Sequence, residues 1–255
     1  MIKKIKIAVL SGGTGRIGGL FLDELIRLDY KVYLLSRSKK KFDNIKNNKK
    51  FNNQVTRLNF DLLNEKIIES SIKKVIKENK RIDCIVNCAS FSNRGKNFRY
   101  NLKNLNKEIM GVFSSSFYLT EKLLPLLRKS SSGKIINVGS LWGMNGVNFG
   151  TYLDLDIGPS AITSSGKAAL MQYTKYLSSR ESENDITVNN LVPGWFPRKG
   201  KVERKDYIKS INSHIPLNRI GKLDDLKSAI SFLLSDKNKY FTGQNVVVDG
   251  GFSII

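Results

Sequence analysis

The chain has 255 residues, of which 40% are hydrophobic and 25% charged, a composition typical of a folded globular domain rather than of a disordered chain. Its apolar runs are too short for a membrane span or a secretory signal, so we expect a cytoplasmic protein with no membrane partner. The formal net charge of +21 is spread along the chain and no nucleic-acid-binding motif accompanies it, so we expect it to favour a phosphorylated cofactor or substrate rather than nucleic acid.

Strand-like and helix-like segments alternate along the whole chain. The strand-like runs are continuously apolar, which is typical of strands covered on both faces, and they span residues 5–10, 31–35, 55–60, 82–87, 134–138, 186–192 and 245–248. Segments with helical spacing lie between them, at 15–28, 64–78, 102–128, 161–180 and 223–234. The alternation predicts one α/β domain over residues 1–255, a Rossmann-type doubly wound parallel sheet of about seven strands with helices on both faces.

A glycine-rich turn follows the first strand-like run and opens the first helix. It reads Ser11-Gly12-Gly13-Thr14-Gly15-Arg16-Ile17-Gly18. Gly13, Gly15 and Gly18 fit the G-x-G-x-x-G spacing, in which glycines let backbone N–H groups approach a pyrophosphate at the positive end of a helix. Residues 12–18 are therefore predicted to bind a dinucleotide.

The end of the second strand-like run predicts which dinucleotide is bound. An NAD site normally has an acidic residue here, about 20 residues beyond the glycines, to bind the ribose 2′-hydroxyl. This chain has Ser36 and Arg37 instead. Serine does not repel a 2′-phosphate and a guanidinium can bind one, and Arg16 in the turn is a candidate second cation. We therefore expect NADP(H), although both arginines could also be ordinary surface residues.

Several other residues carry weaker signals. Cys84 and Cys88 are not spaced as a metal or redox pair, so we expect buried thiols and no metal site. The lone His214 has no partner motif. Two long segments follow strand ends and are expected to form an inserted loop, 141–160, and a substrate loop, 195–214. Trp142 and Trp195 begin these segments and could line a substrate pocket or pack in the core.

The order of these motifs resembles the short-chain dehydrogenase/reductase family over essentially the whole chain. Ser11, Gly12 and Gly18 match that family's T-G-x-x-x-G-x-G, in which Arg16 stands where the middle glycine is expected. Four further segments resemble its N-N-A-G, I-I-N-x-S-S, N-x-V-x-P-G and T-G-x…V-D-G-G motifs, and they are residues 87–90, 135–140, 189–194 and 242–251.

The resemblance implies further cofactor contacts. Asp61 and Leu62 would lie against the adenine, and Asn87 and Ala89 beside the ribose. The same comparison adds three residues to the predicted cofactor site, namely Lys167, Pro193 and Gly194.

The catalytic residues of the family are only partly present. Its enzymes use Ser, Tyr and Lys, with an Asn completing a proton relay, and the Lys ammonium lowers the Tyr pKa. Ser140 and Lys167 match, but Thr163 stands where the Tyr is expected and Glu108 where the Asn is expected. An aliphatic hydroxyl is a far weaker acid than a phenol, so cofactor binding is better supported than turnover.

Tyr152 is a candidate replacement for the missing phenol. Ser140 and Thr163 are 23 positions apart, more than is usual in the family, and Tyr152 lies in the inserted loop between them. Some sugar-metabolising relatives carry a similar insertion with a loop tyrosine. If the protein is a catalyst, elimination predicts that Ser140, Lys167 and Tyr152 carry the reaction and that Thr163 has a minor role. A tyrosine that only packs beneath the loop is the alternative.

These features predict an NADPH-dependent oxidoreductase that transfers hydride between the cofactor and a carbonyl or hydroxyl group of a small molecule, with sugar-like compounds as candidates. The alternative is a non-catalytic dinucleotide-binding homologue that acts as a sensor or partner subunit. The resemblance also implies self-association, as a dimer or homotetramer, through the helices at 102–128 and 161–180 and through the C-terminal segment.

Overall fold

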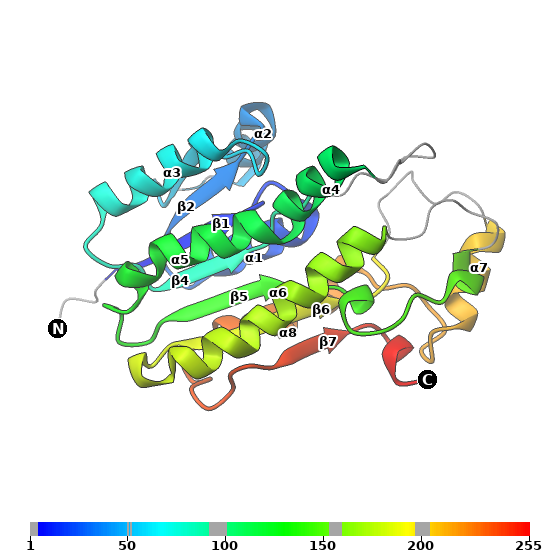
Figure 1. Cartoon of the computed structure of the whole chain (residues 1–255). Helices are drawn as coiled ribbons and strands as arrows, with labels where there is room; N and C mark the ends of the chain where they lie inside the picture. Colours follow the sequence, from blue (N-terminus) through cyan, green and yellow to red (C-terminus); the bar gives the residue numbers. More distant parts are fainter. Residues whose placement is uncertain (1–4, 50, 52, 92–100, 153–159, 197–204) are drawn as a thin grey trace.

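In the computed structural model, which describes residues 5–49, 51, 53–91, 101–152, 160–196 and 205–255, seven strands form one parallel sheet in the order β3-β2-β1-β4-β5-β6-β7 (Figure 1). This confirms the predicted Rossmann-type fold. The strands are β1 (Lys6–Ser11), β2 (Tyr30–Ser36), β3 (Val55–Asn59), β4 (Cys84–Asn87), β5 (Lys134–Val138), β6 (Thr187–Pro193) and β7 (Asn245–Val248).

The strand order reverses beside β1, and this reversal positions the site. Ser11 at the end of β1 pairs with Leu35 of β2 on one side and with Asn87 of β4 on the other. The connections that leave these strands diverge to opposite faces of the sheet, which opens a crevice at their carboxyl ends. The glycine-rich turn lies at that crevice.

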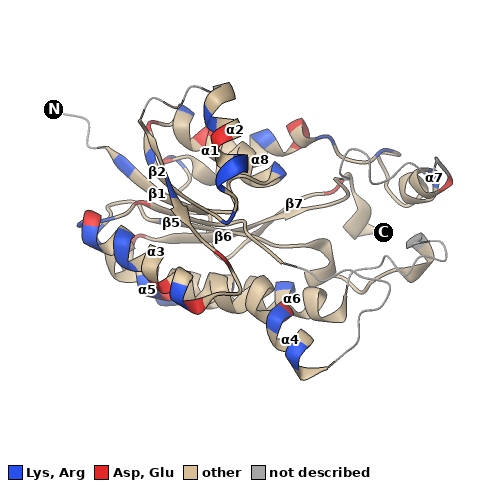
Figure 2. Cartoon of the chain, turned by 90° about the horizontal axis from the view of Figure 1, so that it is seen from above, with Lys and Arg blue, Asp and Glu red and all other residues tan. Residues whose placement is uncertain are grey.

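Helices cover both faces of the sheet (Figure 2). Helices α1 (Arg16–Arg27), α2 (Lys39–Lys49) and α8 (Lys227–Leu234) lie on one face, and α3 (Glu65–Glu78), α5 (Ser115–Leu127) and α6 (Ala161–Arg180) on the other. Side chains alternate along each strand, so Ala8 and Leu10 pack beneath α1 and α8 whereas Val9 packs beneath α3 and α5. Both faces of the strands are therefore buried, as their continuous apolarity predicted.

The segment 102–128, predicted as one helix, contains a break in its hydrogen-bond pattern. Helix α4 (Leu102–Ile109) leads into a π-helical turn (Met110–Ser114), from which α5 continues. Gly111 in this turn lies against Phe91, whose Cβ would be 2.5 Å from an added side-chain atom. The Gly111 carbonyl accepts a hydrogen bond from the Phe91 backbone N–H. The π-helical turn therefore fixes where the end of α4 stands relative to the loop after β4.

Two helices were not predicted from the sequence. Helix α2 is strongly polar, and its Phe42 and Ile45 pack on the cluster beneath α1. Helix α7 (Lys205–Ser213) corrects the prediction of a loop over 195–214, because Tyr207 and Ile211 are buried on one of its faces. Within the described ranges, no helix has both the length and the hydrophobicity needed to cross a bilayer.

Candidate active site

The glycine-rich turn is held tightly against the end of β4. Gly12 has a φ of +73°, in the region that favours glycine, and an added Cβ would lie 2.7 Å from the Ala89 backbone nitrogen. Gly18 leaves even less room, because its Cβ would collide with the Gly12 carbonyl oxygen. The Ser11 hydroxyl accepts hydrogen bonds from the Cys88 and Ala89 backbone N–H groups, both at 3.2 Å. The turn, the start of α1 and the segment after β4 thus pack closely together.

A third arginine, which the sequence analysis missed, stands at the end of β2. Arg57 of β3 donates from Nε to the Ser36 hydroxyl at 3.2 Å, and from Nη2 to the Ser36 and Arg37 backbone oxygens at 3.0 Å each. Ser36 is buried and Arg37 is exposed. The parallel pairing of β2 with β3 brings Arg57 here, and no spacing within the sequence reveals that contact.

The other predicted cofactor residues surround the same crevice. Arg16 donates from Nη1 to the Phe196 backbone oxygen at 2.9 Å, which ties the glycine turn to the segment after β6. Asp61 follows β3 and accepts from the Leu63 backbone N–H at 3.0 Å, with Leu62 half-buried between them. Pro193 ends β6, and Gly194 lies so close to Asp249 that a Cβ would be 2.6 Å from its Cα.

A row of buried amides and hydroxyls fixes the carboxyl ends of β4, β5 and β6. Neighbouring members are 2.8–2.9 Å apart, and in order they are Thr120, Asn87, Asn137, Thr174, Asn190 and Asn245. Within the described residues, Asn87 Oδ1 is buried and has no hydrogen-bond partner. A hydrogen-bonded polar row of this kind specifies one register for the strands, and the Asn87 Oδ1 atom is its one acceptor without a partner among the described residues.

Lys167 and Ser140, predicted as catalytic residues, are brought to the end of β5. Lys167 is buried, and its Nζ donates to the Val138 backbone oxygen at 2.6 Å. Burial lowers the pKa of Lys167 from 10.5 to about 8. Ser140 begins the short 3-10 turn Leu141–Gly143, and its hydroxyl accepts from the Trp142 backbone N–H at 3.3 Å. Gly143 packs on α6 beside Lys167, where an added Cβ would be 3.0 Å from the Lys167 Cβ.

Thr163 and Glu108, the two departures from the family pattern, contact each other. Thr163 Oγ1 lies 2.5 Å from Glu108 Oε1 and donates a hydrogen bond to it. The Ser160 hydroxyl donates to the same carboxylate oxygen and lies 3.0 Å from Thr163 Oγ1. Glu108 has no exposed surface, and Thr163 is buried. The sequence separates these residues by 55 positions, so their pairing is visible only in the fold.

The remaining candidates are Tyr152 and the two tryptophans. Tyr152 ends the short 3-10 turn Phe149–Tyr152, and its side chain lies outside what the structure describes, as do residues 153–159 and 197–204 of the two predicted loops. The rings of Trp142 and Trp195 pack edge to face, with centroids 6.2 Å apart, and both contact Phe252. Their half-buried rings therefore form an aromatic cluster beyond Ser140.

The two cysteines and the single histidine lie in ordinary packing environments. Cys84 is buried and Cys88 is half-buried rather than fully buried as predicted, and burial raises the pKa of both thiols to about 12. The His214 ring lies 2.7 Å from the Ser210 backbone oxygen at the end of α7. No group of metal-binding side chains occurs among the residues whose positions are described.

Comparisons with known proteins identify the family and the fold of the chain. A family model described as enoyl-(acyl carrier protein) reductase matches residues 17–253. The 3-oxoacyl-[acyl-carrier-protein] reductase of Salmonella typhimurium is 28% identical, over 98% of each chain. Among solved structures, Pseudomonas aeruginosa RhlG in complex with NADP has a TM-score of 0.82 at 24% identity, over 97% of this chain and 96% of that one. A Leptospira borgpetersenii short-chain dehydrogenase with bound NAD⁺ has a TM-score of 0.81 at 25% identity, over 98% and 93%.

Proposed function

The chain belongs to the short-chain dehydrogenase/reductase family of oxidoreductases, and from that premise we propose that it uses NADP(H), in preference to NAD(H), to interconvert a carbonyl and a hydroxyl group. The observation that carries the cofactor preference is the corner formed by Ser36, Arg37 and Arg57. A guanidinium that is already oriented by backbone oxygens loses little conformational freedom when it binds a phosphate.

The residues present fit a nicotinamide dinucleotide. The absence of side chains at Gly12 and Gly18 lets the turn pack closely against the Ala89 backbone and against itself. A glycine turn of this kind presents backbone N–H groups to a pyrophosphate at the start of a helix, here α1. Under the proposal, residues 12–18 hold the pyrophosphate and the pair Ser36 and Arg37 holds the 2′-phosphate. The rest of the cofactor would lie against Asp61, Leu62, Asn87, Ala89, Lys167, Pro193 and Gly194. When bound, the dinucleotide would supply or accept the hydride.

Ser140 and Lys167 are assigned the chemical steps that these side chains can perform at the end of β5. The Ser140 hydroxyl donates a hydrogen bond to the substrate oxygen, which polarises a carbonyl or orients an alcohol. The buried Lys167 side chain places a positive charge near Ser140, because its Nζ donates a hydrogen bond to the Val138 backbone oxygen. Tyr152 and Thr163 are the two candidate hydroxyl side chains for proton transfer to or from the substrate oxygen.

The substrate and assembly complete the proposal. Small hydroxyl-rich molecules, including sugar-like compounds, are the candidate substrates, because Ser140 and the polar inserted loop offer hydroxyl-binding groups. We assign the chain to the cytoplasm and to a dimer or homotetramer.

Fluorescence titration with NADPH and NADH tests the cofactor assignment, and a panel of ketones and polyols tests turnover. Tighter binding of NADPH, together with oxidation or reduction of any panel member, is the expected result. Equal affinity for the two cofactors would contradict the assignment.

A non-catalytic dinucleotide-binding homologue is the second candidate function. The observation that favours it is the buried hydrogen bond between Thr163 and Glu108, which occupies the place where the family has its phenol. The chain would then bind NADPH, turn over no substrate, and acquire slow carbonyl reductase activity in the Thr163→Tyr variant.

A further inference from the structure

Glu108 is a fully buried carboxylate whose presence the assignments above leave unexplained. Desolvation of a carboxylate is costly unless hydrogen-bond donors surround it. Here the hydroxyl groups of Thr163 and Ser160 both donate to Oε1. Charge-assisted hydrogen bonds of this kind are about twice as strong as neutral ones. Two hydroxyl donors thus converge on one oxygen of the buried Glu108 carboxyl group.

The residue that contacts Glu108 is also a neighbour of Lys167 on α6. Thr163 lies one helical turn before Lys167, so the two side chains project from the same face of α6. Lys167 Nζ is bound to Val138, two residues before Ser140. The Ser140 turn packs on α6 at Lys167. Thr163 thus contacts the buried Glu108 and lies one helical turn from Lys167, which the Ser140 turn packs against.

The contact changes what an aliphatic hydroxyl can do. An isolated threonine is too weak an acid or base for proton transfer near neutral pH. A hydroxyl whose hydrogen already points to a carboxylate oxygen at 2.5 Å can accept one proton while it gives up its own. No alkoxide need form, because the carboxyl group takes the charge change.

We propose that Glu108, acting through the Thr163 hydroxyl, is the proton reservoir of this oxidoreductase and replaces the phenol that the family uses. The inference rests on the function proposed above. In the oxidation of an alcohol, the substrate O–H proton moves to Thr163 Oγ1 as the Thr163 proton moves to Glu108 Oε1. The substrate C–H bond breaks with its electron pair passing to the nicotinamide dinucleotide, and the C=O bond forms.

Ser160 connects the reservoir to water. It is half-buried, whereas Glu108 is fully buried. After alcohol oxidation the carboxylic acid at Glu108 returns its proton to solvent through the Ser160 hydroxyl, and the carboxylate is restored. Carbonyl reduction follows the same steps in reverse, so the proton count balances in both directions.

Kinetics of isosteric variants test the inference. Glu108→Gln keeps an acceptor oxygen but cannot take up a proton, and Thr163→Val keeps the shape but loses the hydroxyl. Each should lower kcat by about 100-fold or more, and the double variant should be no slower than the slower single one, because the two side chains act as a unit. Thr163→Ser should retain most of the activity. Added formate or acetate should partly restore turnover in Glu108→Ala.

The chain offers matched controls. Ser164→Ala changes a neighbouring hydroxyl of α6 for which the described structure shows no hydrogen-bond partner. Lys107→Gln changes an exposed charge next to Glu108. Both should keep wild-type kcat, and all variants should bind NADPH with wild-type affinity, since none changes a residue predicted to hold the cofactor.

Infrared spectroscopy supplies a measurement that needs neither cofactor nor turnover. In protein labelled with carboxyl-¹³C glutamate, the band that disappears in Glu108→Gln should shift in Thr163→Val and not in Ser164→Ala. An unshifted band would overturn the inference, and so would unchanged kcat in both Glu108→Gln and Thr163→Val.

Two further outcomes separate this inference from the proposed function. Loss of turnover confined to Tyr152→Phe would overturn the inference and leave the oxidoreductase intact. A wild-type chain that binds NADPH but turns over no substrate would overturn both the inference and the catalytic assignment, and would favour the non-catalytic homologue.

Discussion

The side chains at the end of β2 decide which dinucleotide the crevice accepts. Arg57 orients the Ser36 and Arg37 backbone and adds a cation beside them. Hydrogen bonds to charged groups contribute about 1.5–3 kcal/mol, so Arg57→Gln should weaken NADPH binding by about 10-fold or more and change NADH binding little. Arg37→Asp should reduce or reverse the preference for NADPH over NADH.

Fluorescence titration of each variant with NADPH and NADH measures these affinities. Lys39→Gln, which removes an exposed cation, is the control. An equal loss of affinity for the two cofactors would contradict a phosphate contact.

Lys167 makes the stability of the fold depend on pH. Its pKa is lowered from 10.5 to about 8 by burial, so between these values the unfolded chain holds a proton that the folded chain has released. Stability should therefore rise with pH across this window, and below about pH 8 the full penalty is present. At about 1.4 kcal/mol per pKa unit, the penalty is about 3 kcal/mol, offset in part by the hydrogen bond to Val138.

Denaturant unfolding of wild type and Lys167→Met at about pH 7 and about pH 10 measures the effect of the Lys167 charge on stability. The comparison is needed because Cys84 and Cys88, whose pKa values are raised to about 12, oppose the trend above about pH 9. The difference in unfolding free energy between the two proteins should shrink as Lys167 loses its charge. If the difference in unfolding free energy does not change between the two pH values, the pKa of Lys167 is not lowered as stated.

At the scale of the elements, the join between β1 and α1 depends on one glycine. A side chain at Gly18 would collide with the Gly12 carbonyl oxygen, whereas the nearest atom to a Cβ at Gly19 is the Gly13 oxygen at 4.0 Å. Gly18→Ala should abolish NADPH binding and destabilise the fold by about 1–3 kcal/mol. Gly19→Ala should bind normally and gain about 0.5–1 kcal/mol of helix stability. Thermal unfolding with and without NADPH measures both effects.

Elements that bury many apolar side chains were predictable, and those whose position depends on distant partners were not. Helix α6 has the bounds that its spacing predicted, and β5 and β7 do as well. Helix α2 buries only a few apolar side chains, so its polar composition concealed it. The π-helical turn depends on the contact of Gly111 with Phe91, which no local pattern encodes.

The same distinction holds within the site. The glycine-rich turn, Ser140 and Lys167 lie in local motifs, and the sequence identified them. Arg57 reaches the site through strand pairing, and Glu108 meets Thr163 across two helices. Sequence reasoning treated Thr163 and Glu108 as two separate losses, because only the fold shows that they form a pair.

At the scale of the whole molecule, the charge of +21 acts on every copy of the chain. Lys and Arg lie on helices of both faces (Figure 2). This field favours a phosphorylated cofactor, and it opposes association of two chains at low ionic strength.

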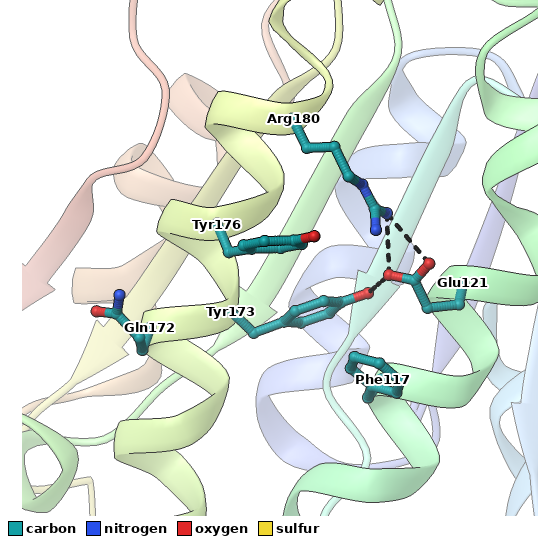
Figure 3. A pocket seen from close by; sticks show the side chains of 6 residues that line it. All are labelled: Phe117, Glu121, Gln172, Tyr173, Tyr176 and Arg180. Carbon is teal, nitrogen blue, oxygen red and sulfur yellow. Dashed lines mark hydrogen bonds and ion pairs between the residues drawn. The ribbon is translucent and has the colours of Figure 1, made fainter.

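We expect copies of the chain to associate through the outer face of α5 and α6. Phe117, Tyr173 and Tyr176 line a hollow of about 430 Å³ there, bordered by the ion pair of Glu121 with Arg180 (Figure 3). Phe117 and Tyr176 remain 39% and 58% exposed. Apolar rings beside a charge pair of both signs suit an isologous contact, because each copy offers an acid and a base to the other.

Phe117→Asp should therefore dissociate the oligomer. It places a charge in the centre of the expected contact, and truncation of a central aromatic residue typically costs an interface about 2 kcal/mol or more. Phe232→Asp is the matched control, because Phe232 is 44% exposed on α8 at the opposite face of the sheet.

Sedimentation velocity at micromolar concentration should show a dimer or tetramer for wild type and for Phe232→Asp, and a smaller species for Phe117→Asp. Added salt should strengthen the wild-type assembly, because it screens the repulsion between two strongly basic chains. A wild-type monomer at low and high salt alike would rule out association through this face.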